Sequence, residues 1–134
     1  MLQLEQIRKE WESDIMAIMA TISAIGANAI DPKEPILVFF DETATESIQQ
    51  IAVLQKFDAP MHTLSLEEGS QIKIDDQTYT VAFAGGLVAA NLTSIGHATL
   101  YFSAVPQKPM ENGIYLTPTT LPEIHVGSVI TYLP

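Results

Sequence analysis

The stretch Tyr79 to Phe102, YTVAFAGGLVAANLTSIGHATLYF, decides the fold that we predict for this chain. It begins as a strand of alternating residues and breaks at Gly85-Gly86, where the missing side chains permit backbone angles that other residues avoid. Apolar residues between positions 87 and 95 recur at helical spacing, which predicts one or two helical turns. We expect Gly96 to cap those turns. The residues from His97 onward are strong β-formers, so this histidine should lie where a turn meets a second strand.

Short apolar runs separated by turn residues continue on both sides of this stretch. Their spacing of about ten residues predicts a mainly β fold, a small barrel or sandwich of short strands. Residues 2 to 13 instead show the apolar spacing of a short amphipathic helix. We therefore divide the chain into an N-terminal helical extension, 1-14, and a single β domain, 15-134. Besides the two strands at the ends of the Tyr79 to Phe102 stretch, the predicted strands are 15 to 25, 36 to 40, 64 to 66, 71 to 74, 114 to 116 and 128 to 133.

Residues 45 to 57, TESIQQIAVLQKF, fit more than one assignment. Their beginning favours a helix capped by Thr43 or Thr45, followed by a strand over residues 51 to 54. The β-branched residues of this short run favour a strand, so both assignments remain open for it.

Composition excludes several classes of protein. The formal net charge is −10, from 16 acidic and 6 basic residues. It argues against nucleic acid binding, because phosphate neutralisation requires clustered Lys and Arg. An acidic surface either favours a basic protein partner or only keeps the domain soluble. The absence of cysteine excludes disulfides and thiolate metal sites.

The N-terminal sequence and the uncharged run bear on location. The first residues, MLQLEQIRKEWESD, carry mixed charges and no apolar segment, so we expect no signal peptide and a cytoplasmic protein. The run from 78 to 106 lacks charge, but its alternation and its glycine breaks favour buried strands over a membrane span. We therefore expect no membrane insertion.

Three blocks of the sequence carry a family resemblance. They are Ile22 to Asp31, the Tyr79 to Phe102 stretch with Ile95-Gly96-His97 at its centre, and Val126 to Ile130. In this order and at this spacing they resemble the glucitol/sorbitol-specific IIA component of the bacterial sugar phosphotransferase system (PTS), over roughly residues 20 to 132.

The resemblance implies a phosphocarrier of PTS sugar uptake with a glucitol-type IIA β fold. Such a domain takes a phosphoryl group from the phosphocarrier HPr onto a histidine and passes it to the IIB part of a IIB/IIC permease. It would need no cofactor and no metal. A homodimer formed by strand exchange is left open.

The family's accepting histidine falls on Gln55 in this chain. A glutamine amide can hydrogen-bond a phosphate but cannot accept it covalently. If phosphotransfer persists, the acceptor candidates are His97 and His62, with Gln55 and Gly96 as binding residues. The alternative is a non-catalytic IIA-like domain that binds a ligand or partner as a regulator, so enzymatic activity stays open.

The remaining candidates have simpler interpretations. His97 also fits a structural histidine that bonds a backbone carbonyl, and His62 fits a solvated loop. His125 is expected to be an edge or loop residue. The acid pairs Glu67-Glu68 and Asp75-Asp76 fall in predicted turns, where solvated charge is usual.

Overall fold

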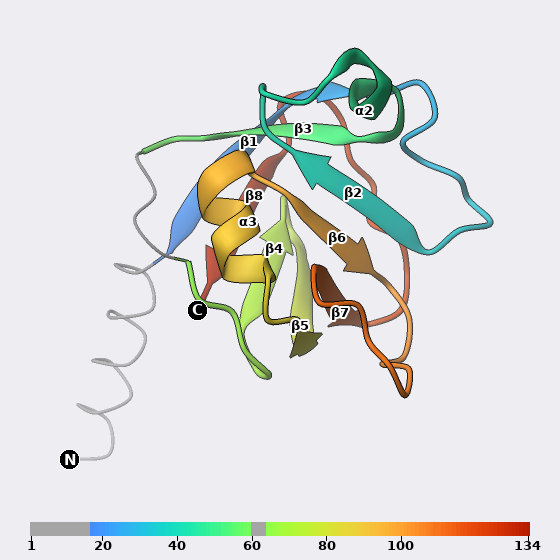
Figure 1. Ribbon diagram of the computed structural model, residues 1–134, viewed down its shortest axis with the longest axis vertical. Coiled ribbons are helices and arrows are strands. Elements are labelled where there is room, and N and C mark those ends of the chain that lie inside the picture. Colours follow the sequence, from blue (N-terminus) through green and yellow to red (C-terminus); the bar gives the residue numbers. More distant parts are fainter. Residues whose placement is uncertain (1–16, 60–63) are drawn as a thin grey trace.

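The computed structural model of the protein describes residues 17–59 and 64–134 (Figure 1). The predicted extension, 1-14, and the candidate His62 lie outside the described residues. Strands dominate the described part, which confirms the predicted mainly β class. The elements are β1 (Ile18–Ile25), β2 (Ile36–Phe40), α2 (Glu46–Ile51), β3 (Val53–Phe57), β4 (Gln71–Ile74), β5 (Gln77–Ala84), α3 (Val88–Ile95), β6 (Ala98–Tyr101), β7 (Gly113–Thr117) and β8 (Val129–Leu133).

The strands form a closed barrel in the order β1-β3-β2-β6-β7-β5-β4-β8. Of the two predicted architectures, barrel and sandwich, the barrel is therefore correct. β8 closes it by pairing antiparallel with both β1 and β4, which are not adjacent in the sequence. Two neighbouring pairs, β2 with β3 and β6 with β7, are parallel. Closure leaves no sheet edge open, because each strand has a partner on both sides.

The barrel interior is filled by side chains that alternate inward along the strands. Each fully buried Leu, Ile or Phe contributes about 1.5–3 kcal/mol relative to exposure. A second, smaller cluster lies outside this core, where Ala44, Ala52 and Leu54 pack with half-buried neighbours. The main core includes Ala20, Ile22, Leu37, Phe39, Val53, Ile72, Ile74, Val81, Leu100, Ile114, Leu116, Ile130 and Tyr132.

The open assignment of residues 45 to 57 resolves into a helix followed by a strand. Thr45 caps α2, and its side chain accepts a hydrogen bond from the Ile48 N–H at 3.4 Å. Ile51 therefore belongs to the helix, and β3 begins at Val53 rather than at 51. The strand predicted at 51 to 54 is thus wrong in both bounds. The helix that Thr45 caps extends through residue 51, so the strand starts two residues later than predicted and ends at residue 57.

The strand predicted over residues 64 to 66 is also wrong. Leu64 and Leu66 are buried in the main core, but this segment has no regular structure. An apolar residue at every second position therefore marked burial rather than pairing, since the closed barrel provides no free edge for another strand.

The turn that follows α3 is as predicted. α3 buries Val88 and Leu92, and Gly96 ends it in the left-handed conformation with φ +61°. A Cβ at this glycine would approach the Cβ of Asp41 to 2.8 Å, so both the angle and the space require glycine. No helix in the described ranges is long and apolar enough to cross a bilayer.

The adjacent glycines Gly85 and Gly86 provide a matched test of this packing. A Cβ at Gly85 would lie 2.2 Å from the Glu111 carbonyl oxygen, whereas a Cβ at Gly86 meets nothing within 4 Å. We expect Gly85→Ala to lower the free energy of unfolding by about 2 kcal/mol or more, because two backbones must move apart. Gly86→Ala should change it by less than about 0.5 kcal/mol. Urea unfolding of both variants checks this, and equal losses would contradict it.

Candidate functional site

Gln55 lies inside the barrel, at the end where α3 packs. It alternates with the outward Leu54 along β3, and its side chain is fully buried. Its Nε2 donates to the Gly96 carbonyl oxygen at 2.9 Å, and its Oε1 accepts from the Tyr132 hydroxyl at 2.7 Å. The Gly96 oxygen can only accept, so the amide nitrogen must face it and the amide oxygen must face Tyr132.

The phenol of Tyr132 is a fixed donor in this group. Tyr132 is fully buried, and burial raises the pKa of its hydroxyl although the bond to Gln55 acts in the opposite direction. The hydroxyl therefore stays protonated and donates a hydrogen bond to the Gln55 Oε1. Both ends of the buried amide are thus paired, which avoids the cost of about 1–3 kcal/mol for a buried polar group without a partner.

A cavity of about 350 Å³ opens beside Gln55. Its rim carries two carboxylates, Asp41 and Glu42, and one ammonium group, Lys56. Carboxylates repel a phosphoryl dianion, so this rim favours neutral or cationic groups unless a partner supplies further positive charge. The lining residues are Asp41, Glu42, Thr43, Gln55, Lys56, Phe57, Ala59, Leu92 and Thr93.

His97 is held on three sides by its neighbours. Its ring stacks on Phe40 with centroids 4.2 Å apart. Its Nδ1 lies 3.0 Å from the Phe39 carbonyl oxygen, and its Nε2 lies 3.2 Å from the Asn112 Nδ2. The carbonyl requires a proton on Nδ1, so Nε2 carries the lone pair and accepts from the Asn112 amide.

Both ring nitrogens of His97 are therefore engaged. The structure thus brings Gln55 and Gly96 into direct contact, while the imidazole of the next residue, His97, is turned to other partners. This is the arrangement of a structural histidine bonded to a backbone carbonyl. A phosphoryl acceptor needs a free lone pair, and this ring offers one only if the bond to Asn112 breaks.

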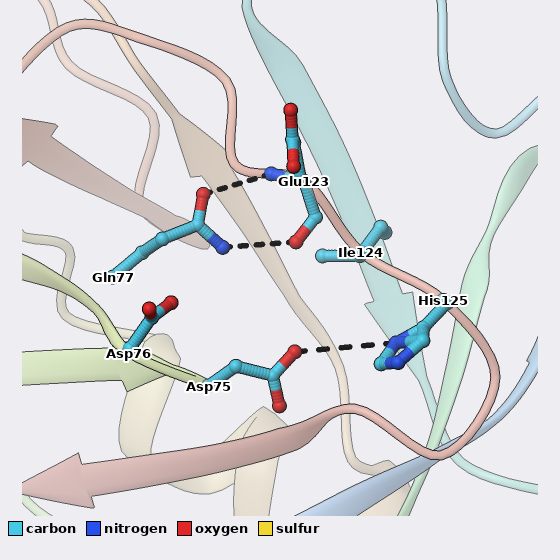
Figure 2. A pocket seen from close by; sticks show the side chains of 6 residues that line it. All are labelled: Asp75, Asp76, Gln77, Glu123, Ile124 and His125. Atoms are coloured by element: carbon cyan, nitrogen blue, oxygen red, sulfur yellow. Dashed lines mark hydrogen bonds and ion pairs between the residues drawn. The ribbon is translucent and has the colours of Figure 1, made fainter.

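A second cavity, of about 480 Å³, lies between the β4–β5 turn and the segment before β8. Figure 2 shows Asp75 facing His125 across this cavity, and the Gln77 amide paired with the backbone of Glu123. The Ser128 hydroxyl connects the first two: it lies 2.8 Å from the Asp75 Oδ2 and 2.6 Å from the His125 Nδ1.

This Asp–Ser–His set has the residues of a hydrolase triad but not its geometry. Ser128 is fully buried, and its hydroxyl donates to Asp75, while the His125 backbone N–H donates to the Ser128 Oγ at 3.0 Å. A nucleophilic serine must instead be exposed and give its proton to the histidine. The group therefore joins the turn to β8 rather than forming a hydrolytic site.

Asp75 is the electrostatic centre of this group. The bond from the Val129 N–H lowers the pKa of its carboxyl most, followed by the Ser128 hydroxyl, against a smaller opposing effect of burial. Asp75 also adopts a left-handed backbone with φ +54°, which Asp tolerates better than most residues. In the described ranges, no three His, Cys, Asp or Glu side chains converge as metal ligands.

Sequence reasoning missed Tyr132 and the group around Asp75. Tyr132 follows the alternation of a core strand, and nothing local indicates that its hydroxyl reaches across the barrel to residue 55. Asp75 was predicted as a solvated turn residue, yet its carboxylate accepts from the backbone of β8, 54 positions away. The one available signal was Asp75 itself, a residue type that favours left-handed turns.

Comparisons with known proteins agree with one another. The family model described as PTS system glucitol/sorbitol-specific IIA component matches residues 17–131. The crystal structure of a PTS system IIA component from Enterococcus faecalis V583 is 41% identical, with a TM-score of 0.82; the match covers 87% of this chain and 99% of that one. A search of curated proteins found no match.

The low pKa of Asp75 predicts a pH dependence of stability. Because its pKa lies below the ordinary value of 3.8, the carboxylate stabilises the fold above that pH and loses its effect as the pH falls through the folded-state pKa. We expect the free energy of unfolding to fall between about pH 5 and pH 2 more steeply in the wild type than in Asp75→Asn. Asp76→Asn removes a carboxylate from the same turn and is the matched control for the change in charge. Equal slopes for wild type and Asp75→Asn in urea titrations would refute the assignment.

The contacts of His97 predict a loss of stability when the ring is removed. His97→Ala should lower the free energy of unfolding by about 2 kcal/mol, because two hydrogen bonds and the stack on Phe40 disappear. The side chain of His125 is 73% exposed, so His125→Ala should cost less than about 1 kcal/mol. Chemical denaturation at pH 7 compares the two variants. If His97→Ala leaves the free energy of unfolding unchanged, the structural role of the His97 ring is refuted.

Proposed function

This chain belongs to the glucitol/sorbitol-specific IIA family of the PTS, and we propose that it is a non-phosphorylated member that acts by binding partner proteins. Family membership, expected from three sequence blocks, is confirmed. The proposal concerns what this member does with the fold. It assigns a regulatory docking role in place of the phosphoryl relay that the family name implies.

The observation that carries the proposal is the state of Gln55. The family resemblance puts the accepting histidine at this position, and here the residue is a fully buried amide bonded to Gly96 and Tyr132. An amide nitrogen has no basic lone pair, so no N–P bond forms on it. The pairing of both amide ends supports a residue that is built into the barrel rather than one awaiting a substrate.

The partners proposed are those of a IIA domain, HPr and the IIB/IIC permease components, which also implies a cytoplasmic location. The net charge of −10 supports a partner with a basic surface, because opposite charge accelerates encounter. The rim of the cavity beside Gln55 contributes two of these carboxylates. Binding at this face requires no chemistry from residue 55.

A second candidate function keeps the phosphoryl relay and moves the acceptor to His97 or His62. What favours it is the position of His97, which directly follows the glycine that holds Gln55. Under this reading the Asn112 amide releases Nε2 when a donor docks. The two candidates differ in whether the wild-type protein becomes covalently modified.

Incubation with Enzyme I, HPr and labelled phosphoenolpyruvate separates these functions. We expect no acid-labile label on the wild type, because Gln55 offers no nucleophile, while an NMR titration with HPr shows saturable binding. The control is a titration in about 0.5 M salt, which should weaken binding between oppositely charged faces. Label on the wild type that disappears in His97→Ala or His62→Ala would establish the relay instead.

A further inference from the structure

We propose that Tyr132 is a second determinant of the silent site, so that a histidine restored at position 55 stays unreactive while the Tyr132 hydroxyl is present. The inference rests on the proposed function, since it takes position 55 as the place where a phosphoryl group would bind. It assigns to Tyr132 a positioning role that acts through residue 55.

The first step is the polarity of the two partners around residue 55. The Gly96 carbonyl oxygen only accepts, and it takes an N–H at 2.9 Å. The Tyr132 hydroxyl donates, at 2.7 Å, and burial keeps it protonated. The surroundings therefore present one acceptor and one donor, which suits any side chain that carries one N–H and one lone pair.

A neutral imidazole is such a side chain. It has one protonated and one unprotonated nitrogen across a single carbon, as a carboxamide has its nitrogen and its oxygen. In Gln55→His the protonated nitrogen is expected to donate to Gly96 and the other to accept from Tyr132. The tautomer that satisfies both partners leaves no lone pair free.

Phosphoryl transfer requires that lone pair. In the transfer, it forms an N–P bond while the P–N bond to the donor histidine breaks, and the released donor imidazole takes up a proton from water. The acceptor keeps its own N–H on the Gly96 carbonyl. With the lone pair already bonded to a buried phenol, the nucleophile must first give up that hydrogen bond without compensation from solvent.

Access to residue 55 is a separate condition. Gln55 is among the residues that line the cavity of about 350 Å³, but its side chain is fully buried, so a donor reaches it only when neighbouring side chains move. This condition is the same for all the variants compared below, whereas only the hydroxyl of Tyr132 engages the reacting nitrogen. Removing this oxygen alone, in Tyr132→Phe, keeps the ring that packs near Phe57.

The test compares Gln55→His with the double variant Gln55→His/Tyr132→Phe, using phosphorylated HPr and, separately, phosphoramidate, a small donor that needs no docking surface. We expect acid-labile label on the double variant to form about tenfold faster or more than on the single variant, because its lone pair is free. The matched control is Gln55→His/Tyr79→Phe. Tyr79 is another buried tyrosine, but its hydroxyl donates to the Thr120 carbonyl, so this variant should match Gln55→His.

Each outcome decides the inference. Equal rates for the single and double variants, or no label on either with phosphoramidate although both remain folded by circular dichroism, would overturn it. Label from phosphoramidate that forms faster on the double variant, with no label from HPr, would support the role of Tyr132 and refute the proposed docking of HPr. Label on the unmodified wild type would refute the proposed function, and the difference between the two variants at position 55 would still decide the role of Tyr132.

Discussion

Closure of the sheet by β8 is the constraint on which the other features depend. This strand pairs with β1 on one side and with β4 on the other, so the barrel has no edge left to protect. The same strand brings Tyr132 into the interior next to Gln55 and places Ser128 beside Asp75. The polar groups around Gln55 and around Asp75 therefore both depend on the placement of β8.

The polar groups around Gln55 and Asp75 are stabilised in different ways because one is buried and the other is partly exposed to solvent. Gln55 is fully buried, and a neutral amide that is hydrogen-bonded at both ends avoids most of the free-energy cost of burying a polar group. Around Asp75 one side is open, so an ionised carboxylate remains solvated while it fixes the backbone of β8. An imidazole at position 55 would suit the buried site as well as glutamine does. We therefore expect the fold to tolerate either residue at this position.

Local signals and long-range pairing explain what the sequence predicted and what it did not. The strand Ile36–Phe40 and the glycine turn at Gly96 were predicted correctly, because a short apolar run and a left-handed backbone angle are properties of neighbouring residues. The prediction of a strand at 64 to 66 was wrong because it too was based on a local pattern. The alternation there reflects the burial of two leucines and not strand pairing. The choice of a barrel, the contact of Gln55 with Tyr132 and the role of Asp75 depend on residues more than fifty positions apart, and no local pattern encodes them.

The double pairing of β8 has a consequence for folding. β1 and β4 both pair with residues 129–133, so one side of each strand is covered only when β8 docks. A chain in which β8 has not yet docked would expose two unpaired edges and would lack Tyr132 in its interior. Unpaired edges invite pairing with strands of other molecules, so we expect conditions that detach β8 to favour aggregation.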